Sequence, residues 1–234
     1  MHLIFDNLVF FALGLSLTLQ LAVATLIGST AIGIVFGGIA TIDHPLPKFL
    51  VRAYVNVLRG IPLIVNVLFV YFVAPLFGLS LNSFTSASVS LSLWGGANCA
   101  EIVRGGLLAV PRGQREAARA LALKPLIAFR KVILPQALRP IIPALAGLFT
   151  LLVQSTALAA LVGVPELFRN GGIVVERDVI ETGTSPAFIV YGAVLLTYFV
   201  VCSALTRVTR GLERRYDPQR RAALVLDDAS RRAA

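Results

Sequence analysis

Four long stretches of the chain contain no Asp, Glu, Lys or Arg, and this feature constrains the fold more than any other. They are residues 7–42, 60–100, 140–165 and 182–206. A helix rises about 1.5 Å per residue and the hydrocarbon core of a bilayer is about 30 Å thick, so about 20 residues suffice for one crossing. Only 14% of the residues are charged, whereas a soluble domain has about 25%. The sequence therefore predicts a protein whose solvent is the bilayer.

The second stretch, at 41 residues, is long enough for two crossings. It is interrupted by Gly78-Leu79-Ser80-Leu81-Asn82-Ser83, a cluster of turn-forming residues suited to a tight external hairpin. We therefore expect an all-α integral membrane protein with five transmembrane helices in one domain, residues 1–216, followed by a disordered basic tail, residues 217–234. The expected centres of the spans are Val23, Phe69, Leu93, Leu151 and Leu196.

The positive charges predict the orientation, because cytoplasmic loops retain Lys and Arg during insertion. The segments after the first, third and fifth predicted spans hold 19 of the 21 Lys and Arg residues, and only Arg169 and Arg177 lie elsewhere. The N-terminus is thus expected outside and the C-terminus in the cytoplasm. The remaining outer loop carries Glu166, Glu176, Asp178 and Glu181, which we expect to be solvated.

No residue pattern indicates catalysis. His2 and His44 have no neighbouring base or nucleophile, Cys99 and Cys202 fall inside apolar segments, and no metal site is predicted. There is no phosphate-binding GxxxxGK[ST] loop, so any ATP hydrolysis must occur on another polypeptide. Because the positive charges lie in loops between apolar runs, the net charge of +9 does not indicate nucleic-acid binding.

The internal loop over about residues 110–136, here called the coupling loop, is amphipathic and helical in pattern. Pro111 suits a helix start, Lys124-Pro125 is expected to end that helix, and Leu134-Pro135 is expected to turn the chain into the fourth span. Such a helix fits docking into another protein's groove. A helix lying on anionic lipid headgroups would show the same basic amphipathic character.

The coupling loop resembles the EAA loop of ABC importer permeases. In GQREAARALALKPLIAFRKVILPQALRPIIP, Glu116, Ala117, Ala118, Leu134 and Pro135 match the family pattern, Val132 takes the Ile position and Ala122 stands where Gly is usual. The segments AYVNVLRGIPLIVNVLFVYF, NCAEIVRGGLLAVPRGQ and QSTALAALVGVPELFR resemble the polar amino acid branch, so the resemblance covers nearly the whole chain. Ser155 and Ala157 replace residues usual in that branch, and a role for an acidic residue there does not carry over.

The resemblance implies a type I ABC importer permease fold in the bacterial inner membrane. It implies a second permease subunit, two cytosolic ATPases that hold ATP and Mg, and an external solute-binding protein, with no cofactor bound by this chain. The residues implied in coupling to the ATPases are Gly113, Glu116, Ala117, Ala118, Leu121, Ala122, Leu134 and Pro135.

Polar side chains within apolar spans are candidates for the substrate path: Asn66, Gln154, Ser155 and Thr156. Each could instead bond to a neighbouring helix. Near the inner ends of spans, Glu101 and Arg104 are spaced for an ion pair and Arg59 can reach the interface, so these three are expected to act as an inner gate or as a structural anchor.

The predicted function is therefore that of a permease subunit, not an enzyme, in an ATP-driven importer of polar amino acids. The ELFR and VERD segments favour glutamate or aspartate weakly. One alternative is an ion-coupled secondary carrier, which would need an ionisable residue within a span. The other is an assembly subunit without transport, which would leave the EAA loop unexplained.

Overall fold

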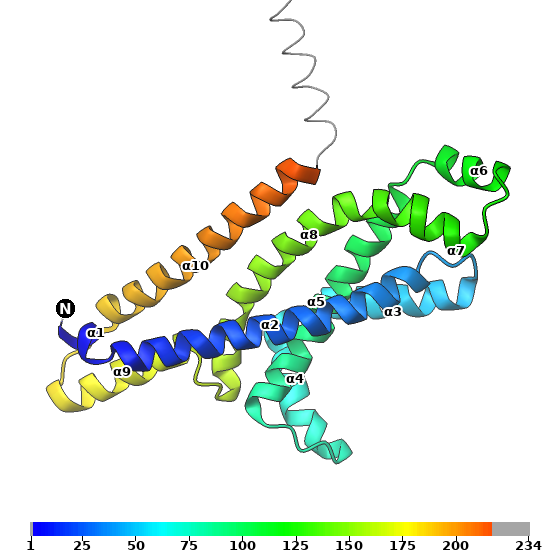
Figure 1. Cartoon of the computed structure of the whole chain (residues 1–234). Coiled ribbons are helices and arrows are strands. Elements are labelled where there is room, and N and C mark those ends of the chain that lie inside the picture. Colours follow the sequence, from blue (N-terminus) through cyan, green and yellow to red (C-terminus); the bar gives the residue numbers. More distant parts are fainter. Residues whose placement is uncertain (1, 217–234) are drawn as a thin grey trace, which may run out of the picture.

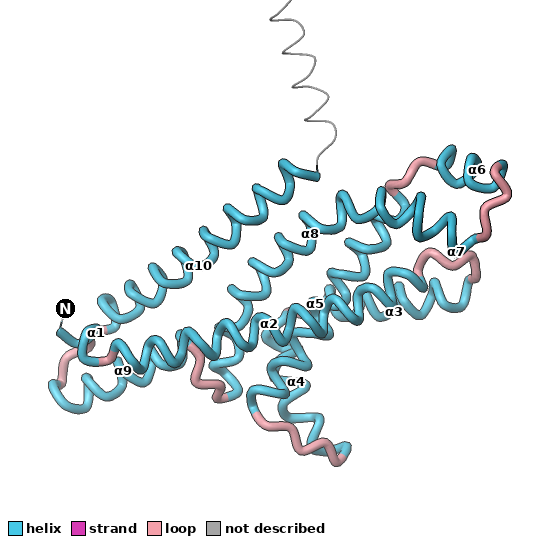
Figure 2. The backbone as a smooth tube through the Cα atoms, in the orientation of Figure 1, coloured by secondary structure: helices cyan, strands magenta, loops and turns pink. Residues whose placement is uncertain are grey.

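Residues 2–216, the part of the chain that this computed structural model describes, form helices joined by loops. No strand occurs among these residues, and Figure 2 shows helices joined by loops. The segments, labelled in Figure 1, are α1 (His2–Asp6), α2 (Leu8–Ile39), α3 (Pro45–Gly60), α4 (Leu63–Val73), η1 (Ala74–Phe77), α5 (Ser83–Leu108), α6 (Arg112–Ala120), α7 (Pro125–Ala128), η2 (Phe129–Ile133), α8 (Leu134–Ser155), η3 (Thr156–Val162), α9 (Leu167–Thr182) and α10 (Ala187–Tyr216). The predicted tail, residues 217–234, lies outside the described residues.

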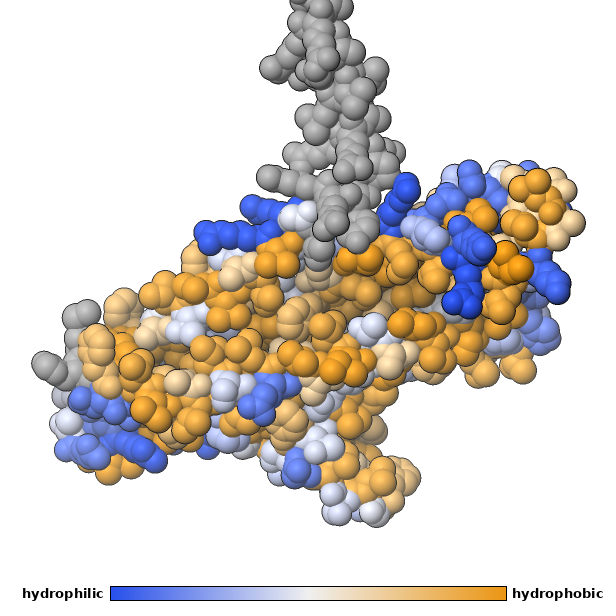
Figure 3. Space-filling view, in the orientation of Figure 1, coloured by the Kyte–Doolittle hydropathy of each residue, from blue (hydrophilic) through white to orange (hydrophobic). Residues whose placement is uncertain are grey.

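Three helical segments are long and apolar enough to cross a membrane: Leu8–Ile39, Pro125–Val162 and Ala187–Gly211. The predicted first, fourth and fifth span centres, Val23, Leu151 and Leu196, lie within them. Hydrophilic residues gather over α6 and α7 at one end of the molecule and near α9 at the other, and apolar surface dominates the part between (Figure 3). This distribution fits a bundle whose middle lies in lipid.

The predicted second span is not one straight helix. It consists of α3 and the segment Leu63–Phe77, which meet at an angle of 104°. Pro62 causes the break, because a proline ring excludes the helical conformation of the residue before it, and Ile61 is accordingly extended. Counting this bent pair gives up to four spans by length and composition.

The predicted third span corresponds to α5, which contains Leu93 and has 26 residues. Its sequence is rich in Ser and Gly, and so α5 is less apolar than the three segments above. The reason is its position, since it packs against α2, α3, α4 and α8 and buries about half of its residues among them. The predicted turn before it is present, with Gly78 in the left-handed region and the Asn82 side chain accepting a hydrogen bond from Thr85 N. Five spans therefore stays a prediction that the helix arrangement supports.

The pair α2 and α5 forms the most extensive helix contact of the described chain. Small residues let the two backbones approach closely. Gly33 of α2 lies directly against the Cys99 side chain, and a Cβ atom at Gly37 would lie 2.6 Å from Cβ of Val103. Both cysteines, which fall inside apolar segments of the sequence, are free and buried.

Two expected helix ends in the coupling loop are wrong. The first helix, α6, ends at Ala120, and Lys124-Pro125 starts α7 instead of ending α6, because proline suits a first helical position. Leu134-Pro135 does not turn the chain: α7, η2 and α8 run on as one helical segment. The turn before Pro135, η2, is a π-helix in which Leu134 N bonds to Phe129 O. Such a widened turn relieves the clash of a proline ring with the preceding turn.

Candidate functional site

Helix α6 displays most of the motif residues at the surface. Gly113, Glu116, Ala117 and Leu121 are exposed, whereas Ala118 is buried against the rest of the protein. The exposed residues therefore form a ridge with small side chains and one carboxylate, which another protein can approach closely. Leu134 is half-buried and Pro135 is exposed where α8 begins.

Two side-chain contacts fix α6 to the long helices. Arg115 donates from Nη2 to the carbonyl oxygen of Leu107, the next-to-last residue of α5, at 2.7 Å. Gln136 of α8 donates to Oε1 of Gln114 at 3.2 Å. The sequence analysis missed Gln114 and Gln136, since only their spatial proximity marks them. Movement of α6 would therefore be passed to α5 and to α8.

A hollow of about 350 Å³ lies between α6 and the end of α5. It is lined by Leu108, Val110, Arg112, Arg115, Glu116 and Arg119. Charges of both signs thus meet at the exposed side of the coupling loop, which suits a polar protein partner better than an apolar one.

Ala122 occupies the position where the resembling family usually has Gly. Its φ of 51° makes it the single non-Gly residue with positive φ among residues 2–216. Leu121 and Leu123 N bond back to Ala117 and Ala118 O, which closes the end of α6. The sharp bend expected for Gly is therefore kept with Ala, at a cost in backbone strain.

The expected inner ion pair is present. Arg104 Nη2 lies 2.6 Å from Glu101 Oε2, and Nε of Arg104 donates to both carboxylate oxygens. Both side chains are only partly buried, so the pair contributes about 0–1 kcal/mol to stability. Arg59 is exposed at the end of α3, where the chain breaks before α4. The structure gives it no bond to the pair.

The turn between α2 and α3 holds a second ion pair. Lys48 Nζ lies 2.8 Å from Asp43 Oδ1, and this hydrogen bond, together with the charge of Lys48, holds the pKa of Asp43 below its usual value. His44 caps α3 by accepting from Leu46 N. These contacts order the entrance to α3.

The four candidates for the substrate path do not converge on one point. Asn66 is buried and donates to the carbonyl oxygen of Ser90 on α5, so it bonds a neighbouring helix. Ser155 and Thr156 donate to carbonyl oxygens of their own helical segment, Leu151 and Val153.

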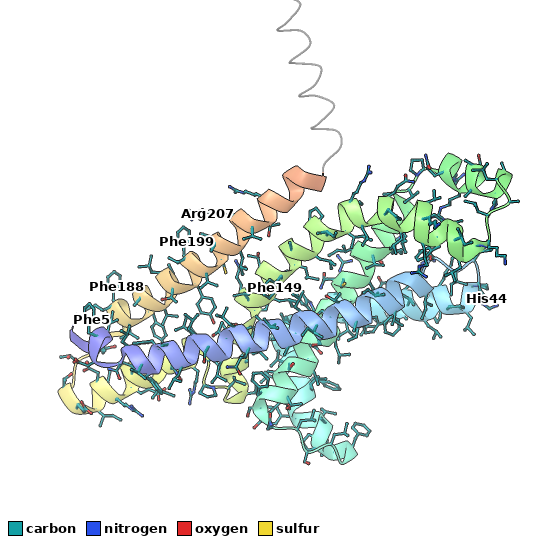
Figure 4. The ribbon with its side chains drawn as sticks, viewed as in Figure 1. Phe5, His44, Phe149, Phe188, Phe199 and Arg207 are labelled. Carbon is teal, nitrogen blue, oxygen red and sulfur yellow. The ribbon has the colours of Figure 1, made fainter. Side chains whose placement is uncertain are left out.

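Gln154 is different, because it is exposed and lines a hollow of about 690 Å³. The other lining residues are Ala157, Phe168, Tyr191, Val194, Leu195 and Tyr198. The hollow thus lies between the end of α8 with the start of η3 and the facing residues of α9 and α10. Phe149 of α8 packs in one apolar cluster with Cys202 and Leu205 of α10. In Figure 4, Phe188 and Phe199 lie on the side of α10 that faces away from α8.

The expectation that Glu166 is a solvated loop residue is wrong. Glu166 is fully buried, while Glu176 and Glu181 are exposed as expected. Its carboxylate caps α9 by accepting from Phe168 N at 2.9 Å and Arg169 N at 2.8 Å. The available sequence signal was an acidic residue directly before a helical stretch, which is a usual capping arrangement.

Among residues 2–216 no group of three or more His, Cys, Asp or Glu side chains is placed to hold a metal ion. The arrangement that remains has two parts. At one end the exposed helix α6 is bonded to α5 and α8. At the other end the buried Glu166 carboxylate caps α9 and accepts a hydrogen bond from Tyr198 of α10.

Comparison with known proteins places this arrangement among transport systems. Residues 29–218 match the family described as binding-protein-dependent transport system inner membrane component. The glutamine transport system permease protein GlnP of Escherichia coli K12 is 34% identical over 204 residues, which cover 86% of this chain and 90% of GlnP. The L-cystine transport system permease protein TcyB of Bacillus subtilis 168 is 34% identical over 170 residues, which cover 73% of this chain and 70% of TcyB.

The fold is also similar to a solved structure. A chain in the crystal structure of an amino acid ABC transporter with histidines superimposes with a TM-score of 0.81 at 29% identity. The match covers 91% of this chain and 96% of that chain.

Proposed function

Because the chain belongs to the family of inner-membrane components of binding-protein-dependent transport systems, the ABC importer permeases, we propose that it is a permease subunit for the uptake of polar amino acids. The observation that carries this proposal is the attachment of the exposed helix α6 to the ends of both α5 and α8. Because this docking helix is bonded to two long membrane helices, a movement of an ATPase bound to it can be transmitted to the helix bundle.

In the proposed mechanism, two cytosolic ATPases bind ATP and Mg and dock on the coupling loops of two permease subunits. The exposed ridge of α6, with Gly113, Glu116, Ala117 and Leu121, meets a groove of the ATPase. Closure of the ATPases then displaces α6, and Arg115 and Gln114 pass the displacement to α5 and α8. The permease itself performs no covalent step.

The substrate class rests on the relatives, which are named for glutamine and cystine. The preference for glutamate or aspartate gains no support from them. It relied partly on Glu166, whose carboxylate is occupied in capping α9. We therefore propose polar amino acids as the class, delivered by an external binding protein, with Gln154 as the candidate contact because its side chain faces the hollow beside α8.

The proposed topology places the N-terminus outside and the C-terminus in the cytoplasm of a bacterial cell. The positively charged coupling loop lies at the opposite end of the described bundle from α1 and α9 (Figure 1), which supports this orientation. Glu101, Arg104 and Arg59 would then lie toward the cytoplasm, as anchor or inner gate.

An ion-coupled carrier would need a buried ionisable group able to exchange ions with both sides. Glu166 is buried, but it already accepts hydrogen bonds from two backbone amides and from Tyr198 and Thr18. This set of donors fits a structural carboxylate better than a relay.

The test is reconstitution in liposomes with the candidate ATPase and binding protein. We expect the three proteins to co-purify and ATP hydrolysis to rise when the binding protein carries a polar amino acid, with uptake that requires ATP and persists with a protonophore. Uptake that needs an ion gradient and no ATP would favour the carrier, and a stable complex without stimulation would exclude the amino acids tried as substrates.

A further inference from the structure

Glu166 joins three segments that are far apart in the sequence. Its Oε2 accepts a hydrogen bond from the Tyr198 hydroxyl of α10 at 2.8 Å. The Thr18 hydroxyl of α2 lies 3.4 Å from the same oxygen and shares its single proton between this oxygen and Gly14 O, at 3.1 Å. The same carboxylate caps α9. We call Thr18, Glu166 and Tyr198 the outer clamp.

The start of α9 is seated on α2 by more than the carboxylate. Leu167 N donates to Oγ1 of Thr18 at 3.1 Å, and the buried Asn170 donates from Nδ2 to Phe10 O at 2.9 Å. A Cβ atom at Gly14 would lie 2.8 Å from Nδ2 of Asn170 and 3.0 Å from the Cα atom of Leu167. The backbone of Leu167 and the side chain of Asn170 therefore lie directly against α2 at Gly14.

The contact between α9 and α10 is equally close. A Cβ atom at Gly171 would lie 2.9 Å from Cγ2 of Val194. One apolar cluster combines residues of all three helices: Phe11, Leu167, Val174, Val190 and Val194. Polar and apolar contacts thus hold α2, α9 and α10 together at the same end of the molecule.

The clamp resists separation, because withdrawing Tyr198 or Thr18 would leave a buried carboxylate with fewer donors. The contact with α8 differs: the hollow of about 690 Å³ lies between Gln154 and Ala157 on one side and residues of α9 and α10 on the other. Tyr198 lines this hollow while its hydroxyl bonds to Glu166. Further along the bundle α8 packs against α10 through Phe149, Val153 and Cys202. The free space therefore permits the outer part of α8, around Gln154, to move relative to the clamped helices.

We propose that Glu166 is a positioning residue for transport, which holds the outer ends of α2 and α10 and the whole of α9 as one rigid body while the outer part of α8 moves against it across the hollow. This inference rests on the proposed transport function and assigns a role to a residue outside the coupling loop. The carboxylate acts through Tyr198 and Thr18 and does not touch the substrate.

Three variants separate the clamp from local helix capping. Glu166→Gln removes the charge, Tyr198→Phe removes one donor, and Glu166→Asp keeps a good capping residue but shortens the side chain. In the reconstituted complex we expect each to lower the maximal uptake rate several-fold while the half-saturating concentration of loaded binding protein stays unchanged. If Glu166→Asp and Tyr198→Phe both transport at the wild-type rate, Glu166 is a local cap only and the proposal is overturned.

Matched controls lie on the same two helices. Glu176→Gln makes the same chemical change at an exposed position of α9, and Thr197→Val removes a hydroxyl from α10 that donates to Ala193 O of its own helix and does not line the hollow. Both are expected to transport like the wild type. A loss in the controls equal to that in the clamp variants would overturn the proposal, as would an effect on half-saturation alone.

A distance measurement tests the rigid body without relying on uptake. Cys99 and Cys202 are replaced by Ala, and single cysteines are introduced in pairs at the exposed positions Val9, Ile180, Phe199 and Leu151. Spin labels are then attached to the introduced cysteines. Between nucleotide-free and ATP-bound complexes, we expect the 9–180 and 180–199 distances to stay constant and the 151–199 distance to change, with the first two distributions broadened in Tyr198→Phe. Changes of equal size in all three distances would overturn the proposal. Absence of uptake in the wild type with constant 9–180 and 180–199 distances would instead reject the proposed function and keep the clamp.

Discussion

Arg115 of α6 and Leu107 of α5 are joined by a hydrogen bond from the guanidinium Nη2 to the backbone carbonyl oxygen, 2.7 Å long. The contact uses a carbonyl in the last turn of α5, where helical carbonyls lack partners within the helix. A cation at a helix C-terminus is also favoured by the helix dipole. The coupling loop is thus attached at a point where the sequence offers an acceptor that only an outside donor can use.

Replacing Arg115 by Ala is expected to loosen α6 from α5. A hydrogen bond to a charged group contributes about 1.5–3 kcal/mol, and partial exposure of Arg115 reduces this to about 1 kcal/mol, or about fivefold faster amide exchange in α6. The measurement is hydrogen exchange over residues 112–120, together with uptake per ATP hydrolysed, which should fall.

Arg119→Ala is the control, since Arg119 is exposed on the same helix. Equal exchange and equal uptake per ATP in the two variants would show that the bond to Leu107 O does not carry the coupling.

Glu116→Lys is expected to leave the protein in the membrane and to weaken ATPase docking. The change reverses a charge on the exposed ridge of α6 and touches no span. Like-charge contacts at an interface are unfavourable, and we expect roughly tenfold weaker docking, about 1.4 kcal/mol. Co-purification with the ATPase at increasing salt measures the loss.

The matched control for this charge reversal is Glu176→Lys on α9, which makes the same change at the other end of the molecule. If Glu116→Lys retains the ATPase and supports normal uptake, the role proposed for Glu116 in coupling is wrong.

Much of the fold could be predicted from the sequence, because a helix that crosses the bilayer must be about 20 residues long and nearly free of charged residues. Val23, Leu151 and Leu196 were placed within helices long enough to span. The 104° bend at Ile61-Pro62 could not be placed, since proline is also compatible with the first turn of a straight span. At Pro135 the opposite error was made, because a turn of the chain was predicted where the helix continues. The π-turn before Pro135 lets the helix continue, and no residue pattern predicts such a turn.

In the candidate site, the residues of α6 could be predicted from the sequence, whereas the role of Glu166 could not. The exposed ridge of α6 follows from a local pattern, so its residues could be named from the sequence. The role of Glu166 depends on Thr18 and Tyr198, which lie 148 and 32 residues away. A charge in a short segment between apolar stretches looks solvated until the tertiary contacts that bury it are known.

Ala122→Gly is expected to stabilise the end of α6. An L-residue in the left-handed region costs about 1–2 kcal/mol, and glycine adopts the φ of 51° without that cost. The net gain should be about 1 kcal/mol after the extra freedom that glycine has when unfolded. Stronger protection of the amides of Leu121, Ala122 and Leu123 from hydrogen exchange would measure this stabilisation. Ala117→Gly, within the same helix, should shift protection in the opposite direction, and a loss of protection in Ala122→Gly would contradict the strain assigned to Ala122.

Adjacent glycines near the end of α2 provide the sharpest test of the contact between α2 and α5. A Cβ atom at Gly37 would lie 2.6 Å from Cβ of Val103 and 2.8 Å from Ala100 O, whereas at Gly38 no atom lies within 4 Å. Overpacking of this kind costs about 1–3 kcal/mol, so Gly37→Ala should lower the Tm of the purified protein by several degrees, at about 2–4 °C per kcal/mol.

Gly38→Ala should leave the Tm unchanged or raise it slightly, because Ala is the better helix former by about 0.5–1 kcal/mol. The two variants make the same Gly→Ala change at adjacent positions. A difference between their Tm values therefore reports the effect of the close contact between α2 and α5. Equal Tm values would mean that the helices can separate at Gly37 without loss, and that the close contact between Gly37 and Val103 does not contribute to stability.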